Sequence, residues 1–198
     1  NDYEPIPKCQ IKEYCKMSSA SKRLYIIHQM DGGNKAYNMP VALEIHGDLN
    51  CNKVKMAFQT IAKRHDALRT SFHIINEEYI QKIQDEVFID ITEKEIPATT
   101  REEKEALLSK FVTTFDLSKA PLLRIEIIKT MDQCYLLMFD MHHIISDGVS
   151  LNILIQEFSV LYSGGSLSKP RIQYTDYSEC TFHSDYGGLF YCHLFLKH

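Results

Sequence analysis

The segment from Cys134 to Met141 constrains the fold of this chain most, because it is apolar almost throughout. A segment this short cannot cross a membrane as a helix, which needs roughly 20 apolar residues. It is typical of a central strand whose two faces are both covered by other elements. The chain has 198 residues, enough for one ordinary domain or two very small ones. We therefore expect a layered fold built around this strand.

Periodic apolar residues predict helices and further strands along the rest of the chain. Repeats of three and four residues predict helices over 18–29, 50–62, 101–114 and 149–162. Alternation of apolar and polar residues predicts strands over 41–45, 68–75, 78–83, 87–92 and 122–129. Asn76 and Glu77 form the expected hairpin turn, and residues 1–17 an extended leader. This order predicts an α/β sandwich in which residues 18–165 form one mixed sheet with helices against it.

Charge and composition argue against several classes of partner. The net charge of −4 and the pI near 6.1 argue against nucleic-acid binding, which usually requires a basic face. No apolar run is long enough for a membrane span, and the first residues lack the basic and apolar regions of a secretory signal. The 6 cysteines are scattered without a CxxC pair, as in a reducing compartment. We therefore expect a cytoplasmic protein that binds neither nucleic acid nor membrane.

The residues best suited to chemistry follow the central strand and precede the last predicted helix, as His-His-Ile-Ile-Ser-Asp-Gly over 142–148. A neutral imidazole can hold or accept a proton near neutral pH. A carboxylate is favoured at the start of a helix, and a glycine lets backbone or ligand approach closely. Adjacent side chains on a strand point to opposite faces, so the two histidines do not predict a metal site. Taken alone, the segment is also compatible with a loop that holds two ordinary histidines and a helix cap.

This segment is one of four that resemble, in order, the motifs of condensation domains of nonribosomal peptide synthetases, within the wider chloramphenicol-acetyltransferase-like family. The four segments are Ser18–Tyr25, Arg64–Phe72, His142–Gly148 and Tyr174–Glu179. The first departs from the family by having Ser21 in place of Gln, and the second by having Asp66 in place of Glu. The resemblance implies a chloramphenicol-acetyltransferase-like mixed-sheet α/β sandwich, of which residues 1–179 are the N-terminal subdomain.

The resemblance ends at Cys180, where the family motif has Trp, and residues 181–198 show no family pattern. We expect residues 180–198 to be an atypical tail, which a truncation, a shifted reading frame or a misassigned end would produce; the alternative is an N-terminal subdomain with an unusual end. Four residues of the tail could be read as zinc ligands, but their spacing matches no zinc pattern and no metal is predicted. They are Cys180, His183, Cys192 and His193.

The family's reaction implies a role for each residue of the histidine segment. Two carrier proteins present their substrates on phosphopantetheine arms, and the acceptor amine attacks the donor thioester to form an amide. The resemblance implies that His143 is catalytic, either as a base for the amine or by orienting it and stabilising the tetrahedral intermediate. His142, Asp147 and Gly148 are then structural residues of the active site. The phosphopantetheine arms are substrates, and no cofactor is expected to bind directly.

Two arginines of the second motif, Arg64 and Arg69, are the local candidates to pair with Asp147 and so hold the loop. Either arginine is equally compatible with a solvated charge at the end of a helix. By the resemblance, Arg23 and Tyr25 line the donor side, or Tyr25 belongs to the core. These alternatives stay open on the sequence alone.

Two other functions share parts of the pattern. Another acyl-CoA-dependent acyltransferase could carry the same histidine segment, although the Arg64–Phe72 motif favours the synthetase family. A fragment without catalytic activity is the second alternative, because the family's tunnel lies between two subdomains and this chain supplies one wall. The implied partners are peptidyl or aminoacyl carrier proteins and a C-terminal condensation subdomain, with self-association through the exposed subdomain face. We expect the chain alone to be inactive and the whole domain to serve antibiotic or other secondary metabolism.

Overall fold

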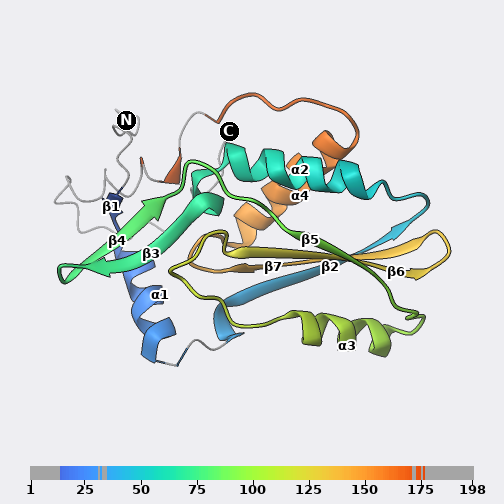
Figure 1. Cartoon of the computed structure of the whole chain (residues 1–198), viewed down its shortest axis with the longest axis horizontal. Helices are drawn as coiled ribbons and strands as arrows, with labels where there is room; N and C mark the ends of the chain where they lie inside the picture. Colours follow the sequence, from blue (N-terminus) through green and yellow to red (C-terminus); the bar gives the residue numbers. More distant parts are fainter. Residues whose placement is uncertain (1–13, 31, 33–34, 171–172, 175, 177–198) are drawn as a thin grey trace, which may run out of the picture.

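Two β-sheets form in the part of the chain that the computed structural model describes, residues 14–30, 32, 35–170, 173, 174 and 176 (Figure 1). The strands are β1 (Tyr14–Lys16), β2 (Asn38–His46), β3 (Thr70–Ile75), β4 (Glu78–Ile83), β5 (Ile91–Glu95), β6 (Leu123–Met131) and β7 (Cys134–His142). The larger sheet has the order β2-β7-β6-β5, and the smaller has the order β1-β4-β3. β7 is antiparallel to both neighbours, whereas β5 is parallel to β6, so the larger sheet is mixed.

The expectation of one sheet over residues 18–165 is wrong. β3 and β4 form a hairpin that pairs with β1, where Tyr14 lies opposite Lys82. β1 falls within the segment that we expected to be an extended leader. Alternating residues identify a strand, but they carry no information on which sheet the strand joins. The fold class, a mixed-sheet α/β sandwich, is confirmed.

Helices cover the larger sheet on both faces. The helices of the described chain are α1 (Ser19–Met30), which lies beside the smaller sheet in Figure 1, and α2 (Cys51–Arg64), α3 (Arg101–Phe111) and α4 (Gly148–Tyr162), with short 3₁₀ turns η1 (Lys35–Tyr37) and η2 (Asp66–Arg69). Figure 1 shows α2 and α4 on one face of the larger sheet and α3 on the opposite face. Every residue of β7 from Leu136 to His142 is buried. The apolar segment is therefore the doubly covered central strand that the sequence predicts.

Alternate residues of β7 supply two separate cores, because successive side chains of a strand point to opposite faces. Leu137, Phe139 and Met141 belong to the main cluster, together with apolar residues of α2 and α4. Leu136 and Met138 belong to a second cluster that includes apolar residues of α3. Each helix layer is thus held by its own half of the side chains of β7.

α3 is shorter than the predicted helix over 101–114. Its start is fixed by a capping box in which Thr100 and Glu103 exchange hydrogen bonds. Beyond its end, the carbonyl oxygen of Thr114 accepts a hydrogen bond from Arg124 at 3.0 Å. The carbonyl oxygen of Thr113 likewise accepts from the Asn38 side chain at 2.8 Å, so the backbone after Phe111, where the helix ends, is held by distant residues.

The predicted hairpin turn is confirmed, whereas the strand after it is displaced. Asn76 and Glu77 have φ values of 49° and 64°, as a two-residue turn of this kind requires. The strand predicted over 87–92 begins only at Ile91. The Gln59 side chain explains the difference, since it makes two hydrogen bonds, of 2.6 and 3.1 Å, to the backbone just before that strand.

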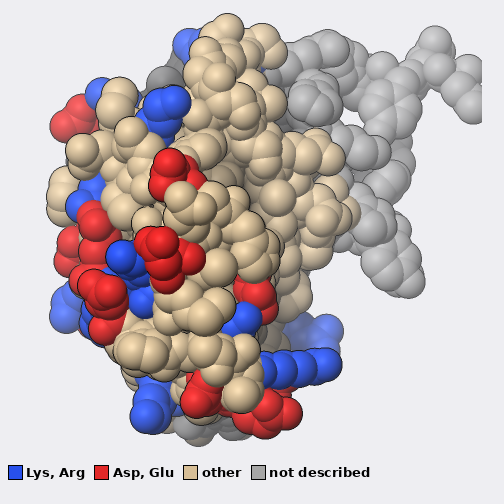
Figure 2. All heavy atoms as spheres, turned by 90° about the vertical axis from the view of Figure 1, so that its right-hand side faces the viewer, with Lys and Arg blue, Asp and Glu red and all other residues tan. Residues whose placement is uncertain are grey.

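Charged side chains of both signs are mixed on the face that Figure 2 shows, and a broad area without charge lies beside them. Among the described ion pairs, Lys55 lies 2.6 Å from Glu93, and Lys94 lies 2.6 Å from Glu126. This face therefore lacks the one-sided positive charge typical of nucleic-acid binders. None of the helices within the described ranges has the length and apolar character that spanning a membrane would require.

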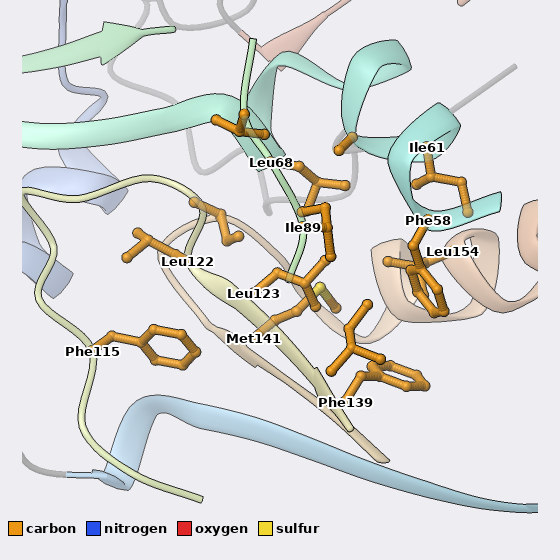
Figure 3. Packing of buried hydrophobic residues seen from close by; sticks show 14 of the residues in the cluster. Phe58, Ile61, Leu68, Ile89, Phe115, Leu122, Leu123, Phe139, Met141 and Leu154 are labelled. Atoms are coloured by element: carbon orange, nitrogen blue, oxygen red, sulfur yellow. The ribbon is translucent and has the colours of Figure 1, made fainter. Parts of the chain in front are cut away.

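Phe58 of α2 connects three elements in the main cluster (Figure 3). It is 1% exposed. Its ring stacks on Phe158 of α4 with 5.0 Å between centroids and lies 6.2 Å from the ring of Phe139 of β7. The two helices on this face are thus joined to the central strand through one side chain.

Replacing Phe58 by Ala should lower the free energy of unfolding by about 3–5 kcal/mol, because it removes a buried ring and leaves a cavity. Urea denaturation of the 198-residue chain, followed by circular dichroism, measures this loss. Phe88→Ala is the matched control, since Phe88 is 78% exposed. The control should stay within about 0.5 kcal/mol of the wild type. Equal losses for the two variants would contradict this packing.

Candidate functional site

The histidine segment lies where the sequence places it, at the end of the central strand. His142 is the last residue of β7, His143 follows it, and α4 begins at Gly148. His142 is completely buried, whereas His143 is exposed. The backbone N–H of His143 donates to the Tyr37 carbonyl at 2.8 Å, and that of Ile145 donates to the His142 carbonyl at 3.1 Å. The two neighbouring imidazoles therefore have different surroundings.

Both ring nitrogens of His142 take part in hydrogen bonds inside the protein. Its Nδ1 accepts from the backbone N–H of Ile144 at 3.1 Å. Its Nε2 lies 3.3 Å from Nδ1 of His28, and the two rings meet edge to face with 5.0 Å between centroids. Nε2 of His28 lies 3.1 Å from the carbonyl oxygen of Phe115. These bonds leave the ring of His142 no nitrogen with which to contact a ligand.

The charge state of His142 agrees with these bonds. Burial, with a smaller contribution from the neighbouring His28 and His143 rings, lowers the pKa of His142 to about 3. The ring is therefore neutral near pH 7, with one N–H donor and one acceptor nitrogen. Of this pair of histidines, His143 is the one whose ring is open to solvent. It is the imidazole that could exchange a proton with a bound molecule.

Asp147 holds the start of α4. It is the N-cap residue, and its Oδ1 accepts hydrogen bonds from the backbone N–H and the hydroxyl of Ser150, at 2.8 and 2.7 Å. A capping carboxylate also interacts favourably with the dipole of the helix. The side chain of Asp147 therefore fixes the end of the loop that begins with His143.

The two arginines that we considered as partners of Asp147 have other partners in the structure. Nε of Arg64 lies 2.8 Å from Oε1 of Glu157, and Nη2 of Arg69 lies 2.6 Å from Oδ1 of Asp66. Each arginine side chain is 14% exposed, so neither is a solvated charge. The interpretation of the two arginines as solvated charges is thus wrong, and none of the ion pairs found among the described residues joins either of them to Asp147.

Glu157 is a buried residue of α4 that the sequence reasoning missed. Its Oε2 lies 2.7 Å from Nε2 of His65, so one carboxylate binds two residues of the second motif. Burial by itself raises the pKa of Glu157, but hydrogen bonds and charge from His65 and Arg64 outweigh it and lower the pKa overall. A signal was present, since Glu157 falls on the apolar face of the predicted helix, between Leu154 and Phe158.

The fourth motif contacts the first through a buried tyrosine. The hydroxyl of Tyr174 lies 2.5 Å from Oγ of Ser18 and 2.9 Å from Oγ of Ser21. Oγ of Ser18 also accepts from the backbone N–H of Ser21 at 3.2 Å, which caps the start of α1. Ser21, the residue that departs from the family pattern, is thus part of a buried hydroxyl cluster.

The fourth motif region also contacts the second motif. The Gln173 side chain donates to the carbonyl oxygen of Arg64 at 2.9 Å and accepts from the backbone N–H of Asp66 at 3.2 Å. The backbone N–H of Gln173 donates to Asp176 at 2.8 Å. Hydrogen bonds thus join the fourth motif region to the end of α2, although the two are far apart in the sequence.

Three further residues that we named are Gly148, Tyr25 and Arg23. A Cβ added to Gly148 would meet no atom within 4 Å, so packing of the described residues does not require a glycine there. Tyr25 is 8% exposed and belongs to the main core cluster. Arg23 is exposed on α1.

No group of three or more His, Cys, Asp or Glu side chains that could hold a metal ion occurs among the described residues. The four tail residues considered as zinc ligands, Cys180, His183, Cys192 and His193, lie outside those residues. The whole predicted tail over 180–198 does so as well.

Asp147→Ala should lower the free energy of unfolding by about 1 kcal/mol, the usual cost of losing a helix N-cap. Asp147→Asn should keep most of that stability, because an Asn side chain caps a helix equally well. Differential scanning calorimetry of the two variants separates the effect of the capping hydrogen bonds on stability from the effect of the negative charge. If the Asn variant loses as much as the Ala variant, the charge of Asp147 rather than its hydrogen bonds holds the loop.

Acidification should destabilise the chain through His142. With a pKa of about 3 in the folded chain against 6.5 as its ordinary value, the ring takes up a proton first in the unfolded state. Burial of His142 as a neutral ring therefore does not lower the free energy of unfolding above pH 6.5, but it lowers that free energy progressively as the pH falls towards 3. The slope is at most about 1.4 kcal/mol per pH unit.

The measurement compares unfolding free energies of the wild type and His142→Asn between about pH 7 and pH 5. Asn does not titrate there, and its oxygen can still accept from the Ile144 N–H. Burial raises the pKa values of Asp66 and Asp140, which changes stability in the opposite direction, but both proteins share these groups. The free energy of unfolding of the wild type should fall more steeply on acidification than that of His142→Asn. Parallel dependences on pH would contradict the burial of His142 as a neutral ring.

The sequence matches the model of the condensation-domain family over residues 11–184. Bacitracin synthase 2 of Bacillus licheniformis is 45% identical over 174 residues, which cover 88% of this chain and 7% of that protein. Gramicidin S synthase 2 of Brevibacillus brevis is 42% identical over 176 residues, which cover 89% of this chain and 4% of that protein. The chain therefore corresponds to a small part of the length of these relatives.

Solved structures share the fold. A complex of the X-domain and OxyB from teicoplanin biosynthesis contains a chain with a TM-score of 0.79 and 21% identity, over 89% of this chain and 40% of that one. The starter condensation domain of rhizomide synthetase gives a TM-score of 0.75 at 16% identity, over 86% of this chain and 45% of that one. The expected chloramphenicol-acetyltransferase-like architecture is thereby confirmed.

Proposed function

This chain belongs to the condensation-domain family of nonribosomal peptide synthetases, and we propose that it forms the N-terminal half of an amide-forming active site. The donor is an acyl or peptidyl group held as a thioester on one carrier protein. The acceptor is the amine of an aminoacyl group on a second carrier protein. The amine attacks the thioester carbonyl, a C–N bond forms and the C–S bond breaks. The phosphopantetheine thiol leaves with the proton that the amine loses.

The contrast between two adjacent imidazoles carries this proposal. His142 uses both ring nitrogens inside the protein, whereas His143 is exposed at the end of the central strand. In our proposal His143 contacts the acceptor amine, either by accepting its proton or by holding it and the tetrahedral intermediate in place. An α-amino group has a pKa near 8, so correct positioning could supply much of the rate enhancement.

The substrates reach this histidine on flexible arms rather than as free molecules. We propose peptidyl and aminoacyl carrier proteins as partners, with their phosphopantetheine arms as substrates and no cofactor bound directly to the chain. The open space beside Gly148 is where an arm or the second subdomain could approach. We place the reaction in the cytoplasm, where the thiols of Cys51 and Cys134 would stay reduced.

The second half of the site comes from a C-terminal subdomain in this proposal. Without that subdomain, only one wall of the tunnel around His143 is present, and neither phosphopantetheine arm is held in a closed tunnel. We also propose that copies of the chain associate through the exposed subdomain face, and the described residues leave several large apolar side chains exposed. Among them are Met30, Met56, Ile74, Ile75 and Phe88.

The purified 198-residue chain should therefore form no product with donor-loaded and acceptor-loaded carrier proteins. Product should appear when a separate C-terminal condensation subdomain is added, because proximity supplies much of the acceleration. Mass spectrometry follows the amide, and size-exclusion chromatography of the same sample reports the oligomeric state. Turnover by a monomeric chain alone would contradict the half-site.

A pair of variants tests the role of His143 in the reconstituted domain. His143→Ala should lower the single-turnover rate about 100-fold or more, as loss of an acid–base or positioning group does. His46→Ala is the control, since its side chain is also well exposed, at 74%, but lies on β2. An unchanged rate for His143→Ala would refute the role of this residue. Turnover with acyl-CoA but not with loaded carriers would indicate the acyl-CoA-dependent alternative.

A further inference from the structure

A chain of three hydrogen bonds runs from the Phe115 carbonyl through two buried imidazoles to the loop that carries His143. Its members come from distant parts of the sequence, since His28 lies on α1, Phe115 follows α3, and His142 ends β7. His28 is 5% exposed, Phe115 8% and His142 0%, so solvent has little access to these bonds. Each bond therefore depends on a protein partner.

The two ends of this chain fix the position of every proton in it. The backbone N–H of Ile144 can only donate, so Nδ1 of His142 accepts and the proton of that ring is on Nε2. This Nε2–H then donates to Nδ1 of His28. The proton of the His28 ring is consequently on Nε2, where it donates to the carbonyl oxygen of Phe115. One arrangement of two neutral rings satisfies all three bonds.

The same chain determines how the loop leaves the strand. Three consecutive backbone N–H groups of the loop are bonded, with His143 donating to Tyr37, Ile144 to the His142 ring, and Ile145 to the His142 carbonyl. Among these, the bond of Ile144 is the one that depends on which nitrogen of His142 carries its proton. If that proton moved to Nδ1, two N–H groups would face each other and the loop would have to shift.

We propose that His28 is a positioning residue, which holds His142 in the tautomer that binds Ile144 and thereby sets the place of the His143 ring. This inference rests on the proposed function insofar as His143 serves the reaction, but the hydrogen-bond chain itself does not. The other rings near His142, those of Tyr37 and Phe115, lie at 6.3 and 6.2 Å between centroids and contribute packing. Among the described residues, His28 supplies the acceptor.

Asn and Leu at position 28 make a matched pair, because the two side chains have almost the same shape. The Oδ1 of an Asn can accept from Nε2 of His142 as Nδ1 of His28 does, whereas a Leu cannot accept at all. If residue 28 only filled space, the two variants would behave alike. If it fixes the tautomer of His142, His28→Asn should keep that tautomer and His28→Leu should lose it.

The first test is nitrogen-15 NMR of the histidine rings in the complete 198-residue chain. The wild type and His28→Asn should show His142 protonated on Nε2 and not on Nδ1. In His28→Leu the Nδ1-protonated form of His142 should appear, with a shift of the Ile144 amide signal. A wild-type His142 protonated on Nδ1 would overturn the proposal. So would a Leu variant with unchanged His142 and Ile144 signals. If the Leu variant does not fold, a His142 protonated on Nδ1 in the wild type or in His28→Asn would still overturn the proposal.

The second test measures single-turnover rates and KM in the domain reconstituted with a C-terminal subdomain. His28→Leu should lower the rate constant roughly 10- to 100-fold with little change in KM, because a small misplacement of a reacting group is costly. His28→Asn should restore most of the rate. Equal rates for His28→Leu and the wild type would overturn the positioning role. If the wild type itself shows no turnover, the proposed function fails, while the NMR spectra still test the hydrogen-bond chain.

Discussion

The burial of β7 on both faces is the constraint on which the rest of this structure depends. Its side chains must satisfy two helix layers at once, which fixes the strand in the middle of the larger sheet. The strand ends with His142 still inside and His143 outside. The position of the candidate site is therefore a consequence of core packing, and the difference between the two imidazoles follows from where the strand ends.

Buried polar contacts also join the motifs to one another. Tyr174 binds the hydroxyls at the start of α1, Gln173 binds the backbone after α2, and Glu157 joins α4 to Arg64 and His65. Removing one member would leave others buried without a partner, which is costly. These contacts join the motifs to one another, and in our proposal one of the motif residues, His143, serves the reaction.

Elements with a strong local signal could be predicted from the sequence. The apolar run predicted the central strand, the helical period predicted α2 and α4, and Asn76-Glu77 predicted the hairpin turn. Pairings between distant segments could not be predicted, because the sequence around a residue or a strand does not indicate which distant partner it will contact. The separate sheet with β1, the partners of Arg64 and Arg69, and the contact of His28 with His142 are of this kind. Glu157 could be predicted in part, since its position on an apolar helix face indicates that it is buried but does not indicate which residues it binds.

The central claim is that the folded chain presents His143 and conceals His142. Reaction with diethyl pyrocarbonate at neutral pH tests it most directly, because the reagent modifies neutral imidazoles that it can reach. Tandem mass spectrometry can assign the modification to either of the adjacent residues. The structure predicts that His143 reacts at a rate comparable to the exposed His46, and that His142 reacts only after unfolding. Modification of His142 as fast as His143 in the folded chain would contradict the account.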